Sequence, residues 1–114
     1  MLTAPQFSPE KLAAVLARIE AAARQARRDP GSVRLLAVSK QQPAEAVAGA
    51  ADAGQREFGE NYVREGVAKI EALPDRGLTW HFIGQLQANK TREVAEHFQW
   101  VHTVDRERIA TRLD

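Results

Sequence analysis

Apolar side chains between residues 9 and 28 recur every three or four positions, which is typical of an amphipathic helix. Ser8 suits the N-cap of this helix and Pro9 its first turn, while Asp29-Pro30-Gly31 is expected to end it. The chain is therefore predicted to open with a helix that packs along one side. The packing side consists of Leu12, Val15, Leu16 and Ile19.

Beyond residue 32, short apolar runs alternate with helical patterns of about ten residues. The predicted strands are 33–38, 56–61, 78–84 and 100–104, and the predicted helices are 43–53, 62–73, 89–98 and 106–113. The run 33–38 is apolar at nearly every position, so we expect this strand to be covered on both faces, as in a parallel sheet. Gly54 is the expected C-cap of the helix that follows it.

The order of a helix followed by four strand–helix units predicts an α/β fold with a parallel sheet and right-handed crossovers. Both a doubly wound sheet and a (β/α) barrel have this order. Four strands cannot close a barrel, and the pattern ends on a helix at Asp114 without a Gly or Pro stop. We therefore expect residues 1–114 to form a single domain that stops partway through its architecture.

The amino-acid composition excludes several classes of function but does not select one. The 16 Lys and Arg against 15 Asp and Glu give a net charge of +1, so no nucleic-acid partner is expected. Arg24, Arg27 and Arg28 suit the negative end of the first helix dipole. The absence of cysteine excludes disulfides, thiolate metal sites and a cysteine nucleophile. No run approaches the ~20 apolar residues of a membrane span, and no signal peptide is recognisable, so we expect a cytoplasmic protein.

Ligand sites of parallel α/β folds lie at the carboxyl ends of the strands, so the residues just after each apolar run are the candidates for chemistry. Lys40 follows the first run directly. An amine sheltered at the mouth of the sheet would lose its charge more readily, and a neutral amine is the nucleophile that forms a Schiff base with a carbonyl compound. The alternative interpretation is a Lys that begins the loop and extends its ammonium into water.

Asn61 ends the second predicted strand, His81 lies near the end of the third, and Val104-Asp105 ends the fourth. Asn61 stands near Gly59, whose missing side chain would let a ligand approach, so its amide could bond a ring substituent. Turn chemistry explains the same residues equally well. His81 could stack on a flat ligand or tune a nearby proton, and a core histidine with satisfied nitrogens is the alternative.

Other site types find no support in the sequence. His97 and His102 are five positions apart, which matches neither a helical i, i+4 pair nor a known zinc spacing. The chain contains neither G-x-G-x-x-G nor a P-loop, and it has no nucleophile elbow. We therefore expect no metal site and no binding of dinucleotides.

Three segments at the predicted strand ends match those of a known family in their order and spacing. They are Leu35-Leu36-Ala37-Val38-Ser39-Lys40, Gly54-Gln55-Arg56-Glu57-Phe58-Gly59-Glu60-Asn61-Tyr62 and Trp80-His81-Phe82-Ile83-Gly84-Gln85-Leu86-Gln87-Ala88-Asn89-Lys90. Val104-Asp105 and the first helix match less distinctively. From Ser8 onward, the chain resembles the N-terminal half of the pyridoxal phosphate homeostasis proteins, the YggS/PROSC family.

The resemblance implies a fold, a cofactor and a function. The fold is a (β/α) barrel, or TIM barrel, of the type found in the N-terminal domain of alanine racemase, and this chain would supply about half of it. The cofactor is pyridoxal 5′-phosphate (PLP), held as a Schiff base on Lys40, with Asn61 and His81 lining its pocket. The family implies a protein without catalytic residues that holds PLP, passes it to PLP-accepting apo-enzymes and serves vitamin B6 balance.

Two alternatives and two departures from the family pattern accompany this interpretation. The alternatives are a PLP-dependent racemase-like enzyme, for which a second acid/base residue would be needed, and a truncated module that cannot retain PLP. Gln41-Gln42-Pro43 stands where the family commonly has a Thr-Lys-Pro type sequence, so a second lysine beside Lys40 is missing. The phosphate loops after strands 7 and 8 of a complete barrel are absent, which predicts weaker PLP retention. Unpaired outer strands predict a homodimer or a larger assembly that covers the open sheet edges, or else a chain that is a fragment of a longer protein.

Overall fold

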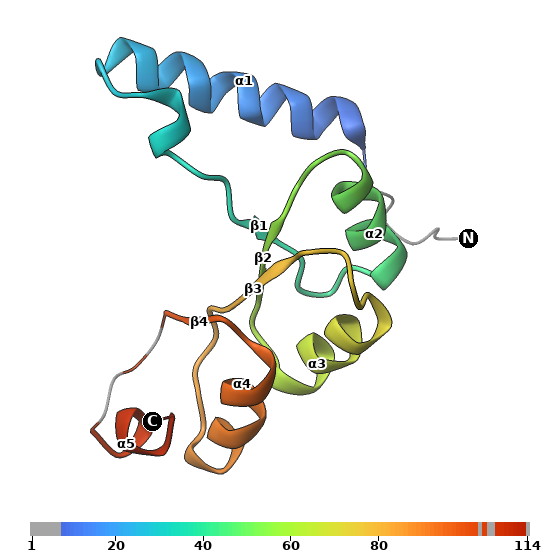
Figure 1. The fold of residues 1–114 in the computed structure, drawn as a ribbon, viewed down its shortest axis with the longest axis vertical. Helices are drawn as coiled ribbons and strands as arrows, with labels where there is room; N and C mark the ends of the chain where they lie inside the picture. The colour runs from blue at the N-terminus through green and yellow to red at the C-terminus, as the bar shows by residue number, and fades with distance from the viewer. Residues whose placement is uncertain (1–7, 103, 105–106, 114) are drawn as a thin grey trace.

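The computed structural model describes residues 8–102, 104 and 107–113, and in this part of the chain helices alternate with the strands of one sheet (Figure 1). The α-helices are α1 (Pro9–Gln25), α2 (Ala44–Asp52), α3 (Val63–Ala72), α4 (Thr91–His97) and α5 (Glu107–Leu113). The strands are β1 (Ala37–Val38), β2 (Glu57–Glu60), β3 (Thr79–Phe82) and β4 (Trp100–Val101). Two 3₁₀ turns, η1 (Pro30–Ser32) and η2 (Ala88–Lys90), precede β1 and α4. The predicted order of elements is confirmed, and each strand is shorter than its sequence pattern.

The strands form one parallel sheet in the order β1-β2-β3-β4. Across it, Val38 pairs with Gly59, Gly59 with His81, and His81 with Trp100. The helices α2, α3 and α4 follow one another along the same side of the strands in Figure 1. The predicted α/β fold with a parallel sheet is therefore confirmed.

The core lies between the sheet and these helices. Phe58, Trp80 and Phe82 occupy alternating positions on β2 and β3, and all three are buried. The rings of Phe58 and Trp80 lie 5.5 Å apart, and Phe82 meets Phe98 edge-on at 5.5 Å. Burying each of these side chains contributes roughly 1.5–3 kcal/mol or more to stability. The helices and loops complete the core with Val47, Ala50, Leu73, Leu86, Val94 and Ile109.

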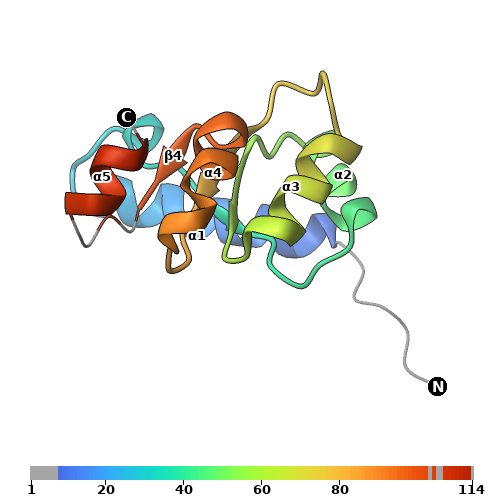
Figure 2. The ribbon, with the colours of Figure 1, turned by 90° about the horizontal axis from the view of Figure 1, so that it is seen from below.

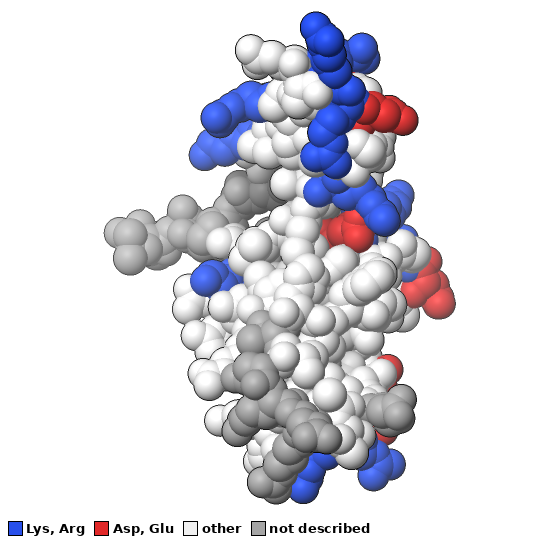
Figure 3. Space-filling view, turned by 90° about the vertical axis from the view of Figure 1, so that its left-hand side faces the viewer, with Lys and Arg blue, Asp and Glu red and all other residues white. Residues whose placement is uncertain are grey.

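The other face of the sheet has far less cover. Successive strand residues point to opposite faces, so Val38 and Trp100 point away from the core, and they are 51% and 58% exposed. The expectation that the first strand is covered on both faces is wrong for this chain, because α2, α3 and α4 cover only one of them. Figure 3 shows the left-hand side of Figure 1, where uncharged residues fill the middle and Lys and Arg gather at the upper end.

Helix α1 begins as predicted and ends earlier. The Ser8 hydroxyl accepts a hydrogen bond from the Lys11 N–H at 3.3 Å, which is the expected N-cap. The helix ends at Gln25, and Arg27 then adopts a left-handed φ of +59°. Val15 and Leu16 remain exposed because α1 lies at one end of the molecule and packs mainly against η1 and α2 (Figures 1 and 2). The predicted packing side of this helix is thus only partly covered.

Candidate functional site

Lys40 lies in a turn that begins where β1 ends. Ser39 continues the β1–β2 ladder by donating its N–H to the Gly59 carbonyl at 3.0 Å, and the Gln42 N–H closes the turn on the Ser39 carbonyl at 3.0 Å. Lys40 itself is exposed, and its side chain has no hydrogen bond or ion pair within the described part of the chain. The predicted shelter at the mouth of the sheet is therefore wrong here, since one face of the sheet is open. The amine is instead accessible to a solute.

Asn61 reaches the same end of the sheet from β2. Val38 and Gly59 are partners in the ladder, and Lys40 and Asn61 each follow one of them by two residues, so they occupy corresponding positions. The Oδ1 atom of Asn61 is buried and has no hydrogen-bond partner among the described residues. An unpaired buried acceptor costs about 1–3 kcal/mol, so this oxygen would gain from a donor brought by a ligand.

His81 lies on the same sheet face, one level deeper than Lys40 and Asn61, because it is the ladder partner of Gly59. Its ring is buried, and both nitrogens have partners. His81 Nδ1 lies 2.9 Å from His102 Nε2, and His81 Nε2 lies 3.0 Å from Glu57 Oε1. The ring also lies parallel to that of Trp100, with centroids 6.1 Å apart. These contacts match the satisfied histidine that the sequence left as an alternative.

Glu57 and His102 were not anticipated as neighbours of His81. Strand periodicity contains the signal, because Glu57 precedes Gly59 by two residues and His102 follows Trp100 by two, which assigns both to the face of His81. Of the predicted site Val104-Asp105, the structure describes Val104, whereas Asp105 lies outside the described residues.

A buried ionic cluster lies behind the Lys40 turn. Lys69 Nζ, from α3, contacts both Glu60 carboxylate oxygens at 3.1 Å and Glu65 Oε2 at 3.1 Å. It also donates to the Ser39 carbonyl at 2.5 Å, and the Ser39 hydroxyl donates to Glu60. Burial raises the pKa of Glu60 above its ordinary value, and the bonds from Ser39 and Lys69 act in the opposite direction. Sequence reasoning missed this cluster, whose one signal is the i, i+4 spacing of Glu65 and Lys69.

A cleft of about 540 Å³ opens beside the ends of β2 and β3. Its lining includes Asn61, Gly84 and the two cationic side chains of Arg64 and Lys90. Gly84 lets the segment after β3 pass close to the turn after β2, because a Cβ at this position would lie 2.0 Å from the Asn61 carbonyl oxygen. The ends of the central strands therefore leave space for a small molecule next to Asn61.

Two other kinds of feature are absent from the residues that the structure describes. In these residues no group of three or more His, Cys, Asp or Glu side chains is placed to hold a metal ion. None of the helices seen in them has the length and apolar character that a bilayer span requires.

Known proteins of similar sequence include several with one and the same name. No family model matches the chain. The chain is 60% identical over 106 residues to the pyridoxal phosphate homeostasis protein of Escherichia coli strain K12, covering 90% of this chain and 45% of that protein. The protein of the same name from Pseudomonas aeruginosa is 60% identical over 104 residues, with coverage of 91% and 45%.

Solved structures agree with this similarity. PipY of Synechococcus elongatus PCC7942, solved with PLP bound, is 50% identical with a TM-score of 0.67, over 86% of this chain and 46% of PipY. An unknown protein from Bifidobacterium adolescentis is 36% identical with a TM-score of 0.85, over 92% and 47%. The chain spans about half the length of the proteins it matches. By sequence and by fold, the chain is similar to the pyridoxal phosphate homeostasis proteins over about half of their length.

Proposed function

We propose that this chain binds PLP as a Schiff base on Lys40, without turnover, and that it serves PLP homeostasis in the cell. The observation that carries the proposal is the PLP bound to PipY, which is 50% identical over 86% of this chain. The names of the relatives from E. coli and P. aeruginosa point to the same cofactor. Cytoplasmic location and delivery of PLP to apo-enzymes are part of this proposal.

The residues at the strand ends fit the chemistry of PLP. PLP brings an aldehyde, which condenses reversibly with a primary amine. Lys40 supplies such an amine in the open. In its neutral form it would add to the aldehyde carbon, and the carbonyl oxygen would then leave as water with the two hydrogens of the amine. Asn61 offers a buried acceptor without a donor, which suits a hydroxyl group on the ring.

His81 is proposed as a deeper lining residue of the same pocket. Because Glu57 and His102 engage both nitrogens, His81 would present its ring rather than a free nitrogen. Its orientation is fixed from two sides, which suits a supporting surface for a flat ligand. We further propose that the four-stranded sheet is about half of a (β/α) barrel, that residues 1–114 act as one PLP-binding domain, and that a homodimer covers the open edges of β1 and β4.

Titration of the full chain with PLP tests the proposal. We expect the visible absorbance of a protein-bound Schiff base, and borohydride reduction followed by mass mapping should place one adduct on Lys40. Lys40→Ala should abolish this adduct, whereas Lys11→Met, which removes another exposed lysine, should leave it unchanged. An adduct on Lys69 or Lys90 instead would overturn the site.

The same material separates the two alternatives. A chain that shows no spectral change with PLP would support the truncated module that cannot retain the cofactor. Conversion of L-alanine to D-alanine by the PLP-loaded chain would support the racemase-like enzyme. The proposed carrier predicts a spectral change with PLP and no conversion of L-alanine to D-alanine.

A further inference from the structure

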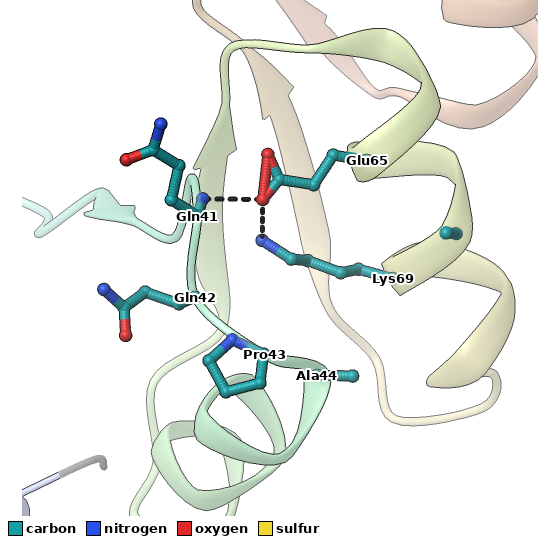
Figure 4. A pocket seen from close by; sticks show the side chains of 7 residues that line it. Gln41, Gln42, Pro43, Ala44, Glu65 and Lys69 are labelled. Carbon is teal, nitrogen blue, oxygen red and sulfur yellow. Dashed lines mark hydrogen bonds and ion pairs between the residues drawn. The ribbon is translucent and has the colours of Figure 1, made fainter. Parts of the chain in front are cut away.

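The turn that holds Lys40 is anchored on both of its sides by the cluster behind it. On the N-terminal side, Ser39 is bound through its carbonyl oxygen to Lys69 and through its hydroxyl to Glu60. On the C-terminal side, the Gln41 N–H donates to Glu65 Oε2 at 2.6 Å. Figure 4 shows Glu65 and Lys69 extending from α3 toward the backbone of Gln41. The residues that flank Lys40 thus depend on side chains of β2 and α3.

Burial of the charged groups restricts the geometry of this anchor. Lys69 is 6% exposed and Glu60 is 0% exposed, so their charges are shielded from water. A buried ammonium is stable only when oxygen atoms surround it, and here the two carboxylates and the Ser39 carbonyl provide them. Moving the Ser39 backbone would remove one of these oxygens from a buried charge. The cluster therefore resists displacement of the strand end that precedes Lys40.

The backbone conformation of Gln41 explains why its hydrogen bond to Glu65 is needed. Its φ of +61° is in the left-handed region, which a non-glycine residue rarely adopts. A turn with such a residue relaxes unless another interaction holds it, and the charge-assisted bond from Gln41 N–H to Glu65 is that interaction. Glu65 is in turn oriented by Lys69, one helical turn further along α3.

We propose that Glu65 and Lys69 are positioning residues for Lys40, which they hold in the turn conformation that lets its amine meet the PLP aldehyde. The inference rests on the proposed function of Lys40. A nucleophile on a fixed turn spends more of its time within reach of a ligand than one on a mobile turn. Removing the anchor should lower PLP affinity even though neither residue contacts the cofactor.

Hydrogen exchange at the Gln41 amide tests the anchor without any cofactor. In Glu65→Ala we expect exchange at this amide to accelerate about tenfold, the size expected for the loss of one charge-assisted hydrogen bond. Glu65→Gln keeps an acceptor oxygen at the same place and should restore most of the protection. Val94→Ala, at a buried position of α4, is the control for a general loss of stability. In this variant the Gln41 amide should keep the local protection that its hydrogen bond to Glu65 provides.

PLP titration of the same variants tests the consequence. We expect the Kd for PLP to rise about tenfold in Glu65→Ala, to rise far less in Glu65→Gln, and to stay near the wild-type value in Val94→Ala. Lys69→Met should behave like Glu65→Ala where it folds. If Gln41 exchange is the same in Glu65→Ala and wild type, the anchor is refuted.

The outcomes also separate this inference from the function it rests on. Faster exchange in Glu65→Ala with an unchanged Kd for PLP would overturn the positioning role and leave Lys40 as the Schiff-base residue. A wild-type chain that binds no PLP, or that carries the reduced adduct elsewhere, would overturn the proposed function, and the positioning role with it.

Discussion

Gly84→Ala would test how tightly the end of β3 must pack against the turn after β2. A Cβ at residue 84 would lie 2.0 Å from the Asn61 carbonyl oxygen and 2.7 Å from its carbonyl carbon. Real Cβ contacts essentially never fall below 3.0 Å, so the Asn61 backbone would have to move by about 1.0 Å (3.0 − 2.0). Because the clashing atoms are backbone, no rotamer change can relieve them, and we expect a loss of about 3 kcal/mol in the free energy of unfolding.

Urea and thermal denaturation measure this loss. At roughly 4 °C per kcal/mol, the Tm of Gly84→Ala should fall by about 12 °C. Gly31→Ala is the matched control, because its added Cβ would meet Asp29 at an ordinary distance of 3.5 Å and should change stability by less than about 0.5 kcal/mol. PLP affinity should also fall in Gly84→Ala alone, since Asn61 moves with the backbone. A Gly84→Ala chain as stable as Gly31→Ala would refute the close approach of these two segments.

Two further predictions concern Glu60 and the open sheet. Because burial raises the pKa of Glu60, the native state binds a proton more readily than the unfolded chain, so this residue's contribution to stability falls as pH rises through its native pKa. In urea unfolding at a series of pH values, wild type should lose stability relative to Glu60→Gln over that interval. A wild type that gains stability relative to Glu60→Gln as pH rises would contradict this sign. Sedimentation of the full chain should show a homodimer, and Val38→Lys, in the edge strand β1, should shift it toward monomer. A compact wild-type monomer at micromolar concentration would argue against the dimer.

Local patterns were sufficient for the order of elements and for the caps of two helices. Ser8 caps α1, and Gly54 follows α2 with a φ of +106°, both as their residue types predict. Each strand proved shorter than its apolar run, since a strand exists only where a neighbour pairs with it. In the run 33–38 only Ala37 and Val38 pair with β2. Sequence position also singled out Lys40 and Asn61, whose role with PLP stays a prediction.

Surroundings of side chains depend on residues that are far apart in the chain. No pattern near Lys40 reveals that its sheet face is open or that Ser39 binds Lys69, which lies 30 positions away. Likewise, the partners of His81 come from β2 and from the end of β4. Capping, turn and periodicity rules act over a few neighbouring residues, so local sequence was enough to assign the helices and strands. Burial and pairing of charges depend on how strands and helices come together in space, so these features emerge only in the folded chain.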